Sequence, residues 1–236
     1  MKIKKEEKGI NKNKIIILLP FWSDEMIKEK IGEYTFDSIK AYIPNDFGYV
    51  HYFFSVDLIN PNPILTRKYF NQLISDIYKD IKKIQNKQKK KEFYIFAQSL
   101  GGLFAMIISD KIEIKKVSLI CPGDNLADCF WNGTATREIR IKMQKSGIKK
   151  EELKKVWLKI SPDYYFKNKS KKTKFYIELS KNDKVIPYKN GKNLIRILKN
   201  KKINLEINEI GLPHELALME EGPFFRKSLD FLVNKT

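Results

Sequence analysis

Ser99 lies in a segment whose residue types could make its hydroxyl a nucleophile. Residues 93–102 read F-Y-I-F-A-Q-S-L-G-G, an apolar strand pattern that runs directly into the serine and then into a helix pattern. A tight turn between a strand and a helix strains the backbone of the serine and leaves room only for small side chains two positions before and after it. Ala97 and Gly101 occupy those positions. The spacing therefore predicts a nucleophile elbow.

A serine hydroxyl needs a base to become a nucleophile, and the chain has two histidines, His51 and His214. His51 lies within an expected strand, which favours a structural role. His214 lies in the loop G-L-P-H-E after the last expected strand. Elbow enzymes place serine, acid and histidine in this order along the chain. We therefore expect His214 to be the general base.

The acid that orients such a histidine belongs in the loop after the preceding strand, which reads L-S-K-N-D-K-V-I-P. Asp183 is the aspartate of that loop, although Asn-Asp is also ordinary turn chemistry. Its occurrence together with Ser99 and His214 favours a catalytic triad over a chance turn. Glu215 and Asp124 remain alternative acids.

Two backbone N–H groups are needed to stabilise the oxyanion that forms during acyl transfer. The N–H of Leu100 lies at the start of the helix after Ser99 and is the first expected donor.

Strand and helix patterns alternate along the chain, which is typical of a mostly parallel central sheet flanked by helices. Strand patterns occur at residues 15–19, 49–56, 93–97, 117–121, 175–180 and 203–210. Helix patterns occur at residues 64–90, 101–110, 136–146, 149–160, 189–199 and 222–234. No linker separates two domains, so we expect residues 1–236 to form a single α/β domain.

The motifs A-Q-S-L-G-G, N-D-K-V-I-P and L-P-H-E resemble those of the α/β-hydrolase superfamily, in its serine esterase and lipase branch. The resemblance implies hydrolysis of a carboxylic ester or related acyl compound through an acyl-enzyme, without a cofactor or metal. An acyltransferase or thioesterase with the same triad, and a non-catalytic basic binding protein on a hydrolase scaffold, remain alternatives. The chain departs from the family at Ala97, which replaces the usual first glycine, and at Leu19-Pro20, where the family often has His-Gly. The resemblance implies that the second oxyanion donor comes from this loop after the first apolar strand. Because Pro20 has no N–H to donate, Phe21 is the expected donor, with Trp22 as the alternative.

Residues 122–174 interrupt the alternation at the place where this family carries a cap over the active site. The resemblance implies a small helical cap there. Several aromatic side chains could line an apolar pocket for the acyl group, or could instead pack the cap against the body of the protein. They are Phe130, Trp131, Trp157, Tyr164, Tyr165 and Phe166. Trp22, in the loop after the first apolar strand, could likewise line the pocket or belong to the core.

The formal net charge of +18 suggests an anionic partner, but the residue types argue against nucleic acid. The chain has 46 Lys plus Arg, and five of these are arginine, although the guanidinium group is the better match to phosphate and guanine. The lysine clusters at 12–14, 87–91, 115–116, 167–174 and 199–202 all precede expected strands. We expect them at the sheet edge opposite the catalytic loops, and docking of that edge to an anionic surface remains an alternative.

Two cysteines form no disulfide framework and no paired metal motif, which favours a reducing compartment. The charged N-terminal residues lack the apolar stretch of about 7–15 residues found in signal peptides. Residues 15–19 are too short to span a membrane. The sequence therefore predicts a cytoplasmic protein without a transmembrane segment.

Overall fold

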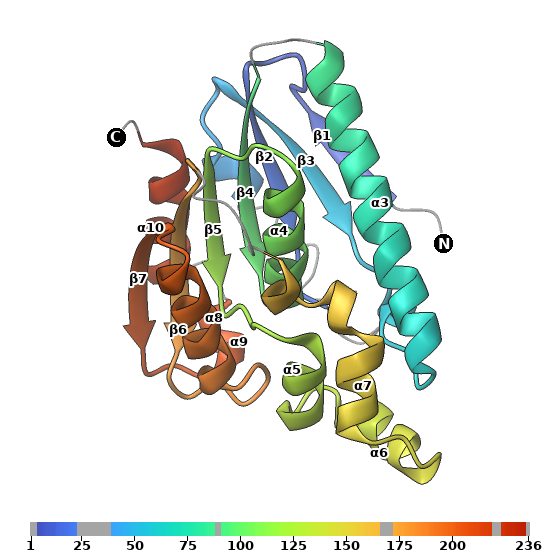
Figure 1. Cartoon of the computed structure of the whole chain (residues 1–236). Helices are drawn as coiled ribbons and strands as arrows, with labels where there is room; N and C mark the ends of the chain where they lie inside the picture. Colours follow the sequence, from blue (N-terminus) through green and yellow to red (C-terminus); the bar gives the residue numbers. More distant parts are fainter. Residues whose placement is uncertain (1–3, 23–38, 88–90, 166–171, 219–222, 235–236) are drawn as a thin grey trace.

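A single sheet forms the centre of the computed structural model, which describes residues 4–22, 39–87, 91–165, 172–218 and 223–234 (Figure 1). Its strands are β1 (Lys4–Lys8), β2 (Lys14–Leu19), β3 (Phe47–Phe53), β4 (Glu92–Gln98), β5 (Lys116–Ile120), β6 (Lys174–Ser180) and β7 (Asn204–Ile210). The strand order is β1-β3-β2-β4-β5-β6-β7, with β1 antiparallel to β3 and the other pairs parallel. The predicted α/β fold with a mostly parallel sheet is confirmed.

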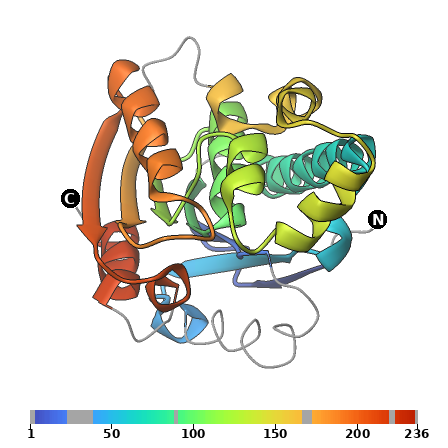
Figure 2. The same ribbon diagram turned by 90° about the horizontal axis from the view of Figure 1, so that it is seen from below.

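Helices cover both faces of the sheet (Figure 2). The α-helices are α3 (Pro63–Lys87), α4 (Leu100–Lys111), α5 (Leu126–Asn132), α6 (Arg137–Lys145), α7 (Lys150–Val156), α8 (Tyr188–Asn200), α9 (His214–Ala217) and α10 (Pro223–Val233). Short 3-10 helices are η1 (Val56–Leu58), η2 (Leu158–Ile160) and η3 (Pro162–Tyr164). One cluster of buried side chains joins the sheet to α3, α4 and α8, and a second joins it to α10.

The central strands are buried on both faces, as their continuous apolar sequences predict. In β2 the run I-I-I-L-L (residues 15–19) is 0% exposed. In α3 the buried residues recur at three- and four-residue steps, so one face of this long helix packs against the core. These patterns explain why the interior elements were predictable.

The sequence patterns did not predict β1 or several of the short helices. β1 is a run of exposed charged residues, and its charges suit an edge strand because they disfavour pairing with another chain. The short helices α5 and α9 have too few residues for a visible period. The expected helix 149–160 is interrupted at Trp157, where α7 gives way to η2.

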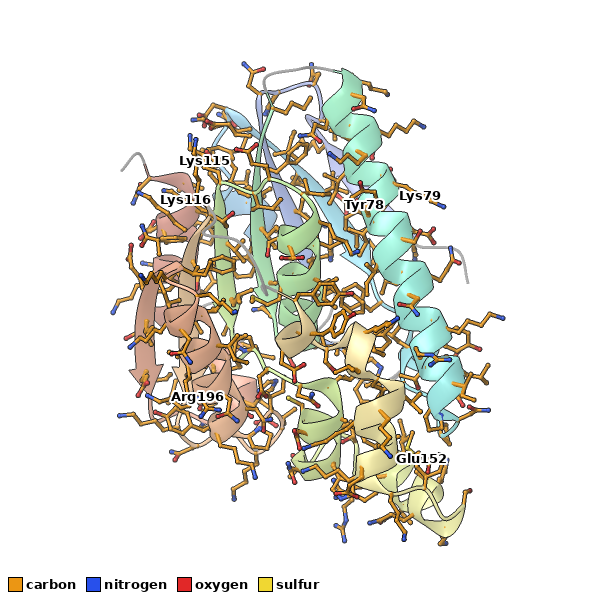
Figure 3. All side chains as sticks on the ribbon, in the orientation of Figure 1. Tyr78, Lys79, Lys115, Lys116, Glu152 and Arg196 are labelled. Carbon is orange, nitrogen blue, oxygen red and sulfur yellow. The ribbon has the colours of Figure 1, made fainter. Side chains whose placement is uncertain are left out.

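The two ends of the parallel strands carry different residues. Ser99 follows β4, Asp183 lies three residues after β6, and His214 lies four residues after β7, so all three lie at the carboxyl edge. Lysines begin β2, β5 and β6 at the other edge. In Figure 3, Lys115 and Lys116 lie at the end of β5 far from α5, α6 and α7.

The segment between β5 and β6 carries α5, α6 and α7 beyond the carboxyl ends of the strands, whereas η2 packs against α3 and η3 against α4 (Figure 1). Residues 166–171, including Phe166 and part of one lysine cluster, and residues 88–90 of another cluster lie outside the described residues. The single-domain and cap assignments stay predictions. Within the described ranges, no helix is long and apolar enough to cross a membrane.

Candidate active site

Ser99 has the backbone conformation expected of a nucleophile elbow. Its φ of 50 and ψ of −119 lie in a region that non-glycine residues rarely adopt. The Ser99 N–H donates a hydrogen bond of 2.8 Å to the carbonyl of Ile120, which fixes the turn against β5. A Cβ at Gly101 would lie 2.2 Å from the Leu19 carbonyl oxygen, so this position admits only glycine without a backbone shift. Packing around the turn therefore maintains the strain at Ser99.

The structure brings Ser99, His214 and Asp183 into one hydrogen-bonded series. His214 Nε2 lies 3.0 Å from Ser99 Oγ, and His214 Nδ1 lies 2.6 Å from Asp183 Oδ2. All three residues are buried. Because an ionised carboxylate can only accept, the Nδ1–H donates to Asp183 and leaves Nε2 to accept from the serine hydroxyl. This arrangement can transfer the serine proton to the imidazole.

Asp183 is oriented by its own loop. Its Oδ1 accepts hydrogen bonds from the N–H groups of Val185 at 2.9 Å and Ile186 at 2.8 Å, which leaves Oδ2 for His214. The same loop is joined to the histidine loop, since the Lys181 N–H donates to the Ile210 carbonyl at 2.6 Å. The positions of acid and base are therefore coupled through the backbone as well as through their side chains.

The alternative acids lie elsewhere. Asp124 accepts a hydrogen bond of 2.8 Å from Asn190 Nδ2, and burial raises the pKa of its carboxyl. Glu215 is exposed to solvent. In the described part of the chain, neither forms a hydrogen bond or an ion pair with His214, whereas Asp183 does. His51 is 2% exposed within β3 and lies against Phe53, with ring centroids 4.1 Å apart and ring planes tilted by 38°, which fits the structural role expected for it.

Cys121 is a neighbour of the site that the sequence did not single out. It follows β5 directly, is buried, and has a φ of 51. Its Sγ, a carboxylate oxygen of Asp183 and a ring nitrogen of His214 lie within 4.8 Å of one another. Burial and the nearby Asp183 carboxylate raise the pKa of the thiol well above its usual value. Its place directly after a central parallel strand was the available signal, because such positions meet at the sheet edge.

The loop after β2 lies against the start of α4. A Cβ at Gly101 would lie 2.5 Å from the Pro20 carbonyl oxygen, so the loop backbone touches the first turn of the helix. Leu100 is the first residue of α4, and its N–H is one of those that a helix leaves without an internal partner. Phe21 follows Pro20 and is half-buried against the cluster under α10, whereas Trp22 packs against the opposite cluster. The donor roles of Leu100 and Phe21 stay predictions.

No family model and no curated protein sequence matches the chain. Solved structures do match. Esterase B from Lactobacillus rhamnosis has 9% sequence identity and a TM-score of 0.63, with 98% of this chain and 86% of that chain covered. A capsule O-acetyltransferase of Neisseria meningitidis serogroup A in complex with CoA has 16% identity and a TM-score of 0.64, with 98% and 91% covered. Acylaminoacyl peptidase of Pyrococcus horikoshii has 14% identity and a TM-score of 0.67, with 97% and 38% covered. The chain has the α/β-hydrolase fold.

Within this α/β-hydrolase fold, two of the expected pocket aromatics are packing residues. Trp157 is 0% exposed, and Phe130 meets it edge to face with ring centroids 5.2 Å apart. The Trp157 Nε1–H donates to the Pro63 carbonyl at 2.9 Å, which ties η2 to the start of α3. The two rings thus join the segment between β5 and β6 to the body. Any contact with substrate stays a prediction.

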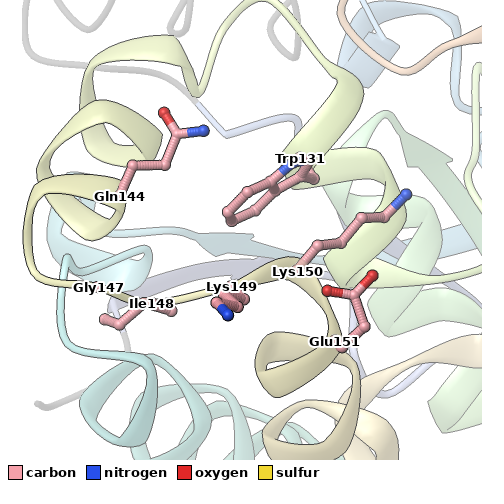
Figure 4. Close-up of a pocket in the computed structure, with 7 residues that line it drawn as sticks. All are labelled: Trp131, Gln144, Gly147, Ile148, Lys149, Lys150 and Glu151. Atoms are coloured by element: carbon pink, nitrogen blue, oxygen red, sulfur yellow. The ribbon is translucent and has the colours of Figure 1, made fainter.

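Trp131 has a different environment. It is half-buried at the edge of an open cavity of about 480 Å³ between the end of α5 and the turn that joins α6 to α7 (Figure 4). The other lining residues are Gln144, Gly147, Ile148, Lys149, Lys150 and Glu151. None of the residues of the Ser99 series lines this cavity, so Trp131 and the series do not share it.

Proposed function

We propose that the chain is a serine hydrolase that cleaves a carboxylic ester or a related acyl compound through an acyl-enzyme. The hydrogen-bonded series from Asp183 through His214 to Ser99, with the serine at a strained strand-to-helix turn, is the observation that supports this proposal. The esterase neighbour with the same fold agrees with it. No step of the proposed reaction needs a cofactor.

In the proposed reaction, Ser99 Oγ attacks the acyl carbonyl while His214 Nε2 takes the serine proton. Asp183 holds the imidazole and stabilises its positive charge. The N–H groups of Leu100 and Phe21 donate to the oxyanion, and His214 then protonates the departing alcohol. Water attacks the acyl-enzyme by the same route and releases the acid. This sequence restores Ser99 and leaves the protein unchanged.

The segment 122–174 is proposed to act as a cap within one domain that spans residues 1–236. Its α-helices lie beyond the carboxyl ends of the strands, on the side where Ser99 and His214 lie (Figure 1). Two free thiols, Cys121 and Cys129, suit a reducing compartment such as the cytoplasm. The partner proposed for the site is a small-molecule ester or acyl substrate.

A series of p-nitrophenyl esters of increasing acyl length tests the proposal. Wild-type protein should hydrolyse at least part of the series, and Ser99→Ala should lose at least about 10³-fold in kcat because the nucleophile is removed. Ser146→Ala is the matched control, since Ser146 is exposed at the end of α6. No turnover by wild type, together with salt-dependent retention on DNA or anionic vesicles, would favour the basic binding protein instead.

A second candidate is acyl transfer to an alcohol. The likeness to the capsule O-acetyltransferase favours it, since 98% of this chain and 91% of that chain are covered and that structure holds CoA. The triad forms the same acyl-enzyme in both reactions, and only the acceptor differs. Product analysis with acetyl-CoA and competing alcohols distinguishes them: acetylated alcohol in excess of free acetate indicates a transferase, and free acid alone indicates a hydrolase.

A further inference from the structure

The thiol of Cys121 lies against two of the three side chains in the proposed catalytic series. Cys121 is 2% exposed, and its Sγ lies within 4.8 Å of both a carboxylate oxygen of Asp183 and a ring nitrogen of His214. The reaction proposed above makes no use of this thiol. Three different donor groups, a thiol, a carboxylate and an imidazole, therefore converge at one buried point.

The backbone fixes the thiol at this point. Cys121 has a φ of 51, a left-handed conformation that side-chain-bearing residues rarely adopt. Its N–H donates to the Glu178 carbonyl at 2.8 Å, which ties it to β6 and so to the strand that leads to Asp183. The preceding carbonyl, of Ile120, accepts from the Ser99 N–H at 2.8 Å. The thiol is thus held relative to both the serine and the acid.

This donor set suits a thiophilic divalent cation. Zn²⁺ binds thiolate sulfur at about 2.3 Å and imidazole nitrogen or carboxylate oxygen at about 2.0–2.2 Å, in a tetrahedral arrangement that keeps a fourth position open to water. Donor atoms around such an ion lie about 3.4 Å apart. Cys121, Asp183 and His214 therefore need side-chain movements of only about 1–1.5 Å to reach that spacing. Thiolate and carboxylate together would neutralise the buried ion.

We propose that Cys121, Asp183 and His214 form an inhibitory site for a thiophilic divalent cation, represented by Zn²⁺ or Cd²⁺. As the sulfur–metal bond forms, the thiol proton leaves to solvent. An ion on His214 Nδ1 replaces the hydrogen bond to Asp183, and the ring proton moves to Nε2. An ion on Nε2 instead takes the lone pair that Ser99 needs. Binding of the ion to either ring nitrogen leaves Ser99 without its base. The inhibition therefore rests on the proposed function, whereas the binding of the ion does not.

Cadmium titration tests the binding without any assay of activity. Replacing Cys129 with serine leaves Cys121 as the sole thiol, because the chain has two cysteines. The Cys129→Ser protein should develop cadmium–thiolate absorption in the ultraviolet that saturates at one ion per chain, and so should a Cys129→Ser, Ser99→Ala chain. The matched Cys121→Ser protein should bind Cd²⁺ at least about tenfold more weakly. Absence of the absorption from Cys129→Ser overturns the proposal, whether or not Cys121→Ser folds.

Inhibition is measured with Zn²⁺ relative to each protein's own activity in EDTA. Wild type and Cys129→Ser should lose activity with Zn²⁺ and regain it with EDTA, whereas the same concentrations of Mg²⁺ should have no effect. Cys121→Ser and Cys121→Ala should need at least about tenfold more Zn²⁺. Equal inhibition of wild type and both Cys121 variants overturns the proposal. Absence of ester turnover in EDTA would refute the proposed function alone, since the cadmium titration still decides the site.

Discussion

At the scale of single residues, hydrogen bonds restrict the conformations of the side chains in the candidate site. Asp183 uses both carboxylate oxygens, Oδ1 toward two backbone N–H groups and Oδ2 toward His214. Because Asp183 is held at both oxygens, it keeps the proton of His214 on Nδ1. Nε2 then faces the Ser99 hydroxyl as a hydrogen-bond acceptor and not as a donor. The proposed reactivity of Ser99 therefore depends on a residue that does not touch it.

Asp183→Asn tests this dependence. The asparagine oxygen can keep the hydrogen bonds from Val185 and Ile186, but its NH₂ group then faces His214 Nδ1 and forces the wrong tautomer. We expect kcat for a p-nitrophenyl ester to fall by about 10³- to 10⁴-fold with little change in thermal stability. Asp57→Asn, at an exposed carboxyl in η1, is the matched control. Activity of Asp183→Asn within about tenfold of wild type would remove Asp183 from the mechanism.

The sequence alone predicted those site residues that belong to a recognisable motif. Ser99, Asp183 and His214 were predicted from their types and their places after strands, and the structure brings them together. The place of Cys121 directly after β5 was the one available signal, but its nearness to Asp183 also depends on strand order and on a positive φ, which no motif records. Which residues meet across the edge of a sheet depends on the tertiary structure.

At the scale of elements, the junction of β4 and α4 determines where the loop after β2 can lie. Gly101→Ala should displace both this junction and the loop, because the new Cβ would lie 2.2 Å from the Leu19 carbonyl oxygen and 2.5 Å from the Pro20 carbonyl oxygen. We expect a lower melting temperature. We also expect kcat to fall by more than the loss of folded protein explains, because the loop positions Phe21, whose N–H is the expected second oxyanion donor. Gly211→Ala is the control, because its Cβ would lie 3.8 Å from the nearest atom, Asn182 Nδ2. Unchanged kcat and melting temperature in Gly101→Ala would contradict the close approach.

The interface of β6 with α10 contains a buried carboxyl. Burial raises the pKa of Glu178 to about 8 from 4.5, although the nearby Tyr176 hydroxyl and the charge of Lys227 act in the opposite direction. Below pH 4.5 both folded and unfolded chains hold this proton. Between pH 4.5 and 8 the unfolded chain releases it first, so the free energy of unfolding should fall as the pH rises and then level off.

Glu178→Gln should remove that slope, because the amide has no proton to lose in this range. Urea unfolding at pH 5, 6.5 and 8 measures it, with a difference between the two proteins of the order of a few kcal/mol. Glu206→Gln, at an exposed position of β7, should keep the wild-type slope. Parallel curves for wild type and Glu178→Gln would show that Glu178 ionises normally in the folded protein.

The elements found from sequence were those whose period extends over many residues or whose apolar run is continuous. β2 and α3 belong to this class. β1 was missed because its stability comes from pairing with β3 and from contacts such as the Lys5–Asp80 ion pair, not from its own pattern. The break at Trp157 was also hidden, since it follows from the burial of that ring against α3. Tertiary packing therefore determines both the formation of β1 and the break of the helix at Trp157.

At the scale of the whole molecule, the lysines that begin β2, β5 and β6 lie at the end of the parallel strands opposite the candidate site, although other cations of the +18 chain lie in α6 and α7. Part of this charge serves the fold itself. Lys116 is 4% exposed, and its Nζ donates to the carbonyls of Phe231 and Asn234 at 2.8 Å each, at the end of α10. A cation used in this way is unavailable to an anionic surface.

Lys116→Met tests this structural use of charge. The substitution removes both hydrogen bonds while keeping most of the apolar stem, and we expect a loss of about 1–3 kcal/mol in the free energy of unfolding with kcat unchanged. Lys199→Met, at an exposed position of α8, removes the same charge from the surface and should cost less than about 0.5 kcal/mol. Equal effects of the two substitutions would show that Lys116 acts only through its charge.

The central claim is that Ser99 is a nucleophile activated by His214. Labelling with a fluorophosphonate probe, followed by mass spectrometry of the labelled peptide, tests it without knowledge of the natural substrate. The probe should modify wild type and Ser146→Ala once per chain, at Ser99, and should leave Ser99→Ala and His214→Ala unlabelled. Undiminished labelling of folded Ser99→Ala, or modification of a different serine in wild type, would contradict the claim.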